Sequence, residues 1–208
     1  MIQQSLLSHL AGQHDFSKAN QVIAMPQAKP FVHSWLTLDL SLSLAQSSDI
    51  EDIHFASPYR HNDEYLKFVS KSASVEPCDK RYASKADLRI STPGKNLWFE
   101  FHVLHQDELA SKKDRNKLYD DTKRVAALRK SLPEDEVMLL VGLWGSFSGE
   151  DIKHFEPLDN NTQCAYVLDT SLTGSTQIAR LSHMKKEGEP RFLLSLIHIS
   201  EPTRRYEI

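Results

Sequence analysis

Residues 85–104, KADLRISTPGKNLWFEFHVL, alternate apolar and polar side chains on both sides of a Pro-Gly pair. This pattern predicts two antiparallel strands joined by a tight turn. One face of the predicted hairpin is apolar and consists of Ala86, Leu88, Ile90, Leu97, Phe99, Phe101 and Val103. A hairpin with one apolar face must pack that face against another layer, so the rest of the chain has to supply helices or strands that cover it.

The opposite face of this hairpin carries two acids. A turn centred on Pro93-Gly94 places Asp87 beside Glu100 and Lys85 beside His102. Directly opposed residues hold their Cβ atoms roughly 5 Å apart, so the two carboxylates share one small space. Like charges this close repel each other, and we therefore expect a cation between them.

Composition is that of an ordinary globular protein. The chain has 208 residues, of which 40% are hydrophobic and 25% charged, and its formal net charge is −3. The overall charge therefore gives no argument for nucleic-acid binding. Cys78 and Cys164 lack metal-ligand or CxxC spacing, which favours two reduced thiols. With no apolar run of membrane-spanning length and no basic segment before an apolar one at the start, we expect a cytoplasmic protein that does not enter a membrane.

The end of the chain is treated separately. Residues 194–204, LSLIHISEPTR, resemble the translation of a transposase-based sequencing adapter along their whole length. We therefore interpret 194–208 as an artefactual tail and expect the natural protein to continue beyond Leu193. The remaining chain divides into an N-terminal helix and connector at 1–30 and one α/β domain at 31–193.

Before the hairpin, the pattern predicts helices and one strand. Residues 31–46 fit both strand alternation and helical spacing, and their many leucines favour a buried helix. Residues 49–55 are predicted to form a strand. Residues 62–70 are predicted to form a helix capped by Asn62, and 72–80 a loop.

After the hairpin, residues 112–132 predict an amphipathic helix, and 136–147 form an apolar run typical of a strand covered on both faces. The apolar side of the helix is formed by Leu118, Val125, Leu128 and Leu132. Residues 150–155 predict a helical turn, 165–168 a strand and 177–184 a short helix. Together these elements predict an α/β fold with a mixed central sheet flanked by helices, in which 136–147 returns parallel to the second hairpin strand.

The order of these elements, with Asp87 in one strand and Glu100-Phe101-His102 in the next, resembles the PD-(D/E)xK nuclease superfamily over residues 83–147. The resemblance implies a restriction-endonuclease-like αβββαβ core in which Asp87 and Glu100 bind Mg²⁺ or Mn²⁺. In that superfamily a Lys two residues after the Glu helps to activate a water. This chain has His102 at that position.

Four readings of this departure stay open. The imidazole of His102 can accept a proton from water, because histidine side chains in general titrate near neutral pH. Lys85, across the hairpin, or Lys123, on the following helix, could supply the missing ammonium group. In the fourth reading the site is inactive and the fold is retained for binding.

The helix predicted at 112–132 contains a second resemblance to this superfamily. Asp121 and Arg124 resemble the Asp-x-x-Arg motif of several families in this superfamily. The basic residues expected to contact phosphates are Lys112, Lys113, Lys117 and Arg124. Surface charge of this kind more often belongs to a solvated helix with paired side chains than to a nucleic-acid contact.

These features predict a Mg²⁺-dependent nuclease that hydrolyses phosphodiester bonds of DNA, with RNA as the second substrate class. The alternative is a catalytically inactive nuclease-like domain that binds nucleic acid or a protein partner. In the simplest reading, Asp87 and Glu100 belong to a solvated sheet face and pair with Lys85 and Arg89.

Overall fold

A mixed central sheet organises the part of the chain that the computed structural model describes. That part is residues 9–10, 18, 21–22, 25–109, 111–146, 148, 150, 164–169, 178–179 and 191–198, with only the backbone at 26, at 109 and from 164 onward. The strands are β1 (Asp52–Pro58), β2 (Arg60–His61), β3 (Glu64–Val69), β4 (Ser74–Cys78), β5 (Lys85–Thr92), β6 (Lys95–His105), β7 (Glu136–Gly145), β8 (Cys164–Asp169), β9 (Ile178–Ala179) and β10 (Arg191–His198). The helices are η1 (Pro26–Phe31), α3 (Val32–Leu44), η2 (Lys80–Tyr82), α4 (Gln106–Leu109) and α5 (Lys112–Ser131).

Two sheets are present among these residues. The larger one has seven strands in the order β1-β5-β6-β7-β10-β8-β9, and the smaller has three in the order β2-β3-β4. Strands β1, β5 and β6 form an antiparallel series, and β7 then pairs parallel to β6 after the crossover through α5. The predicted α/β class and the parallel return of this strand are confirmed.

The hairpin of β5 and β6 forms as predicted, but Ala86 packs in the core on the α5 face and not with Leu88 and Ile90. Pro93 and Gly94 make the turn, and Gly94 has φ +87°, which a residue without a Cβ adopts freely. The two strands pair from Thr92 opposite Lys95 to Leu88 opposite Phe99.

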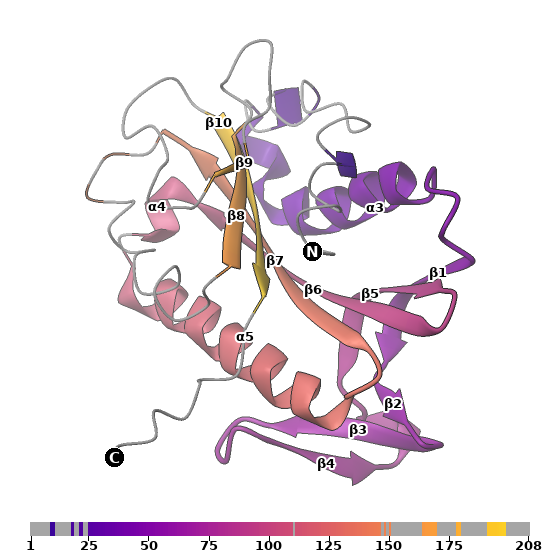
Figure 1. Ribbon diagram of the computed structural model, residues 1–208. Helices are drawn as coiled ribbons and strands as arrows, with labels where there is room; N and C mark the ends of the chain where they lie inside the picture. Colours follow the sequence, from indigo (N-terminus) through magenta and orange to yellow (C-terminus); the bar gives the residue numbers. More distant parts are fainter. Residues whose placement is uncertain are drawn as a thin grey trace, which may run out of the picture.

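The sheet is covered on both faces by separate apolar cores (Figure 1). On one face, α3 packs its Leu36, Leu40 and Leu44 against sheet residues such as Leu88 and Phe99. On the other face, α5 buries its predicted apolar side, which comprises Leu118, Val125, Leu128 and Leu132. The α5 face also receives Leu66 of the small sheet. The central strand β6 therefore lies between two packed layers, and its side chains alternate between them.

Helix α3 confirms the helical reading of residues 31–46 but is buried on one side only. Leu38 and Leu42 are 54% and 67% exposed, because the other leucines of the run already cover the sheet. None of the described helices is both long and apolar enough to cross a bilayer.

The prediction of a helix at 62–70 is wrong. Asn62 and Asp63 both have positive φ, +46° and +67°, which is the geometry of a two-residue hairpin turn. They connect β2 to β3, and the chain returns through β4 at 74–78, where a loop was predicted. Aromatic and β-branched residues of β3 fit a half-buried strand as well as a helix face, and the turn residues decide between the two.

Later segments are described in part. The strand predicted at 165–168 is confirmed as β8, whereas Ile178 and Ala179 form β9 where a helix was predicted. The helical turn predicted at 150–155 lies outside the described residues, except for Glu150. Strand β10 pairs with β7 and β8 and includes residues 194–198 of the segment interpreted as a tail, so the artefactual origin of that segment stays a prediction.

We expect Gly94→Ala to lower the free energy of unfolding by about 1–2 kcal/mol, because an L-residue is strained at this φ. A Cβ there meets no atom within 4 Å, so the effect is conformational and not steric. Urea denaturation measures it. Asn62→Gly, also at positive φ, is the control and should leave stability within about 0.5 kcal/mol of wild type; equal losses in both variants would contradict this account.

Candidate functional site

Asp87 lies where β5 separates from β6. The paired register covers residues 88–92 opposite 95–99 and stops before Asp87, so the predicted direct pairing of Asp87 with Glu100 does not form. Instead, Asp87 Oδ2 accepts the backbone N–H of Phe101 at 2.7 Å. The carboxylate thus satisfies a β6 donor that the departing strand leaves without a backbone partner.

Glu100 is buried, on the α5 face of β6. Its Oε1 accepts a hydrogen bond from the Tyr59 hydroxyl at 2.7 Å and lies 3.0 Å from Nη2 of Arg124. Burial raises the pKa of Glu100 to about 7; Arg124 and Tyr59 oppose that rise, and the charges of Asp87 and Asp121 add to it. The carboxylates therefore interact electrostatically, as predicted, although each has partners of its own.

The two donors to Glu100 come from different layers. Tyr59 is fully buried between β1 and β2, and burial, followed by the Glu100 charge, raises its pKa well above the ordinary value, so the hydroxyl remains a donor. Arg124 reaches from α5 and also donates to the backbone carbonyl of Lys85 at 2.9 Å. Arg124 was predicted to contact phosphate, whereas here its guanidinium joins α5 to both hairpin strands.

Asp87 has a partner on the opposite side of the sheet from α5. His33 of α3 places Nε2 3.6 Å from Asp87 Oδ2, with its ring edge-on to Phe101 at 6.3 Å between centroids. The interaction with Asp87 is the main cause that raises the pKa of His33 above its usual value. Sequence reasoning missed both His33 and Tyr59, because a lone His at a helix start and a Tyr after a strand carry no motif.

His102 and Asp121 form a closely hydrogen-bonded pair. His102 Nδ1 lies 2.5 Å from Asp121 Oδ2, and the His102 side chain is only 11% exposed. A carboxylate can only accept, so Nδ1 donates and Nε2 is the nitrogen left to take a proton. Because Asp121 and Arg124 are three residues apart on α5, they lie on the same helix face and reach His102 and Glu100 respectively.

The predicted lysines are not part of this cluster. Lys123 pairs with Asp120 at 3.1 Å and is 62% exposed, and Lys117 pairs with Asp114 at 2.6 Å. Lys112, Lys113 and Lys85 are exposed. Lys123 is two residues from Asp121, so it points to nearly the opposite side of α5. Of the predicted site residues, the structure therefore brings together Asp87, Glu100, His102, Asp121 and Arg124.

The carboxylate oxygens of Asp87 and Glu100 are donor atoms of the kind that Mg²⁺ and Mn²⁺ prefer. Such ions bind through one or two carboxylates and keep several waters. Among the described residues, Asp87 Oδ1 and Glu100 Oε2 receive no hydrogen bond, so each acid can offer a hard oxygen. Within the same residues, no group of three or more His, Cys, Asp or Glu side chains is arranged to hold a metal. The two acids thus have suitable donor atoms, and the described residues form no closed protein cage around a metal.

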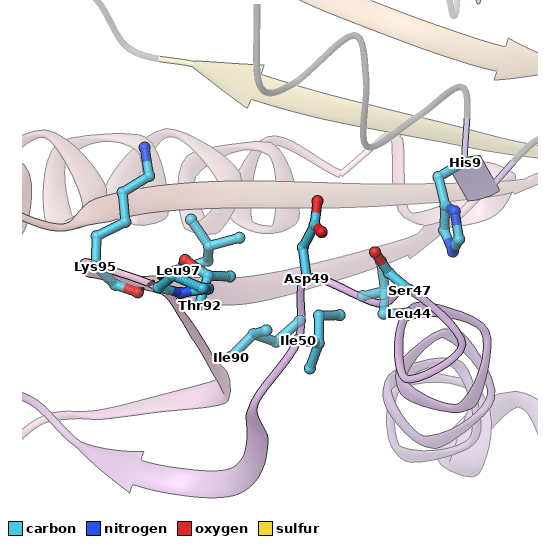
Figure 2. A pocket seen from close by; sticks show the side chains of 10 residues that line it. His9, Leu44, Ser47, Asp49, Ile50, Ile90, Thr92, Lys95 and Leu97 are labelled. Atoms are coloured by element: carbon cyan, nitrogen blue, oxygen red, sulfur yellow. Dashed lines mark hydrogen bonds between the residues drawn. The ribbon is translucent and has the colours of Figure 1, made fainter.

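A separate hollow of about 490 Å³ opens beside the end of α3 (Figure 2). Its floor is apolar, with Leu44, Ile50, Ile90 and Leu97, and Lys95 and Asp49 are among its polar lining residues. None of the acids described above lines it, so it is not part of the same site.

Comparison with known proteins gives no relative. No protein-family model, no curated protein and no solved structure matches this chain.

The buried Glu100 carboxyl should make stability depend on pH. Its pKa rises from 4.5 to about 7 on folding, so between these values the native state binds more protons than the unfolded state and stability falls as pH rises. We expect Glu100→Gln to abolish this loss. The destabilisation caused by Glu100→Gln should then be smaller at about pH 8 than at about pH 5, by about 2–3 kcal/mol. Urea denaturation at the two pH values measures it, and parallel stability profiles of the two proteins would contradict it.

Proposed function

We propose that this chain is a metal-dependent nuclease that hydrolyses phosphodiester bonds of DNA. The observation that carries the proposal is the cluster at the separation of β5 and β6. There Asp87 and Glu100 each keep one carboxylate oxygen that no described residue hydrogen-bonds, and the His102–Asp121 pair belongs to the same electrostatic cluster. Hard oxygen donors together with a proton acceptor are what hydrolysis of a phosphate ester at a divalent ion requires.

The fold supports the same proposal. Helix α3, strands β1, β5 and β6, helix α5 and strand β7 follow one another in the αβββαβ order of the restriction-endonuclease-like core, with β2, β3 and β4 inserted after β1. In this reading the strand that carries Asp87 and the strand that carries Glu100 are neighbours in the sheet.

Each side chain then has a definite role. Asp87 Oδ1 and Glu100 Oε2 would hold Mg²⁺ or Mn²⁺, which when bound acidifies a water and neutralises charge that develops on the phosphate. Tyr59 and Arg124 fix the other oxygen of Glu100 and so orient the free one. His102 Nε2 takes a proton from the attacking water, in place of the usual lysine, and Asp121 holds the ring in the tautomer that leaves Nε2 open.

Cleavage of a mixed panel of supercoiled, linear and single-stranded DNA, with Mg²⁺ or Mn²⁺, tests the proposal. We expect Asp87→Ala and Glu100→Ala to reduce cleavage to background, and Asp121→Ala to reduce it by about 10–100-fold through loss of His102 orientation. Asp120→Ala is the matched control: Asp120 precedes Asp121 but is 66% exposed and bonded to Lys123, and activity should be unchanged. Equal cleavage by wild type and both acid variants would refute the nuclease.

A second function is favoured by one specific contact. Glu100 already has a cationic partner in Arg124 and a donor in Tyr59, so charge repulsion between the acids does not by itself demand a metal. We propose as the alternative a catalytically inactive domain that binds nucleic acid through the exposed lysines at the start of α5, or binds a protein partner.

This alternative predicts no cleavage with any divalent ion. DNA affinity in EDTA should survive Glu100→Ala and fall with Lys112→Ala/Lys113→Ala, since both lysines are exposed and can contact phosphates. Fluorescence anisotropy with labelled DNA measures it. Metal-dependent cleavage that disappears in Glu100→Ala would exclude the alternative.

A further inference from the structure

The small sheet and the helix η2 that follows it together carry two tyrosines among four cations. The Arg60 guanidinium carbon lies 5.9 Å from the centroid of the Tyr65 ring, and the Lys80 nitrogen lies 6.0 Å from the same centroid. Around Tyr82, the corresponding distances are 4.5 Å for Arg81 and 5.9 Å for Lys67. Tyr65 and Lys67 alternate with the buried Leu66, so they lie on the outer face of β3, away from α5. We call this group of six residues the tyrosine face.

The tyrosine face is hollowed and open. Tyr65 and Tyr82 line one depression of about 720 Å³, and Tyr82 is 53% exposed. Asp63, Glu64 and Asp79 also line the depression. Asp63 and Asp79 each pair with an arginine of the face, whereas Glu64 forms no ion pair within the described residues.

Two cations of the tyrosine face remain available for an anion. Within the described residues, Lys67 and Lys80 take part in no ion pair. Glu76 lies opposite Lys67 across β3 and β4, without a salt bridge between them. The face thus offers aromatic rings and two ammonium groups that no ion pair occupies, beside the carboxylates of Glu64 and Glu76.

The tyrosine face is directly connected to the acid cluster. Arg60 follows Tyr59, the donor to Glu100, and Tyr82 lies three residues before Lys85, whose carbonyl binds Arg124. Backbone hydrogen bonds from Tyr59 to Ser84 (2.9 Å), and from Leu66 to Tyr59 (3.0 Å), tie the small sheet to the strand that leads to Asp87. Figure 1 shows this sheet alongside α5, which supplies Arg124 and Asp121.

We propose that the tyrosine face binds single-stranded DNA next to the acid cluster, so that the strand to be cut reaches the site with its bases unpaired. The inference rests on the nuclease proposed above. Bases stack on aromatic rings only where they are not paired in a duplex, and such binding combines aromatic stacking with cations along the backbone. The lysines leave the rings for phosphates when bases take their place, because an exposed cation–ring contact contributes less than base stacking.

Binding of fluorescein-labelled oligothymidylate to the whole chain in EDTA tests the inference without any cleavage. We expect wild type to prefer the single strand over its duplex with oligodeoxyadenylate, and Tyr65→Ala/Tyr82→Ala to weaken single-strand binding about tenfold or more. Tyr65→Phe/Tyr82→Phe keeps both rings and should bind like wild type. Equal binding by the alanine variant, or a preference for the duplex, overturns the inference.

Salt dependence provides a second measurement that does not rely on the tyrosines. Lys67→Ala/Lys80→Ala should reduce the slope of log affinity against log salt by about 1.4, because two contacts with single-strand phosphates are lost. An unchanged slope overturns the inference.

Failure of the nuclease proposal is distinguishable, because it appears as cleavage that persists in Asp87→Ala and Glu100→Ala while tyrosine-dependent binding remains.

Discussion

The buried carboxyl of Glu100 is the constraint on which the arrangement of this site depends. It lies on the central strand β6, under helix α5, where a carboxylate without partners would be strongly destabilising. Arg124 of α5 and Tyr59 of the segment before the small sheet both bind one of its oxygens, so three separate parts of the chain meet at one side chain. Even with these donors, burial raises the pKa of Glu100 to about 7, so the carboxyl changes its charge state close to neutral pH.

The separation of β5 from β6 explains why the second acid is close by but differently held. A strand that leaves a sheet exposes backbone donors, and Asp87 uses its carboxylate to accept one of them from Phe101. This bond directs Asp87 toward the layer of α3, where His33 meets it, while Glu100 and His102 face α5. The site therefore lies where β5 separates from β6, and helices on both faces of the sheet, α3 and α5, contribute side chains to it.

The small sheet extends this site outward. Its inner face packs on α5 through Leu66, and its outer face carries Tyr65 and Lys67 beside Lys80 and Tyr82 of η2. The insertion begins directly after Tyr59, and η2 ends three residues before Lys85, so short connections link the tyrosine face to the segments that hold the acid cluster. Binding and hydrolysis would then be separate properties of neighbouring surfaces, with separate residues responsible for each.

Much of the framework could be predicted from the sequence, because it rests on local periodicity. The alternation around Pro93-Gly94 predicts the hairpin, the three- and four-residue spacing of apolar residues predicts α5, and the apolar run at 136–147 predicts β7. The pairing of Asp121 and Arg124 on one helix face follows from the same periodicity. Residues 62–70 show its limit, because their apolar spacing fits a helix, and only the positive φ of Asn62 and Asp63 makes them a hairpin.

Only the tertiary structure decided which partners the charged groups take. No spacing in the chain indicates that Tyr59 and Arg124 bind Glu100, or that His33 binds Asp87, because these contacts join residues far apart in sequence across packed layers. The register of the hairpin was predictable, but its end before Asp87 was not, since strand separation depends on what packs on either side of the sheet. Periodicity determines which face a side chain occupies, whereas burial and the groups brought to that face determine its charge state and its partner.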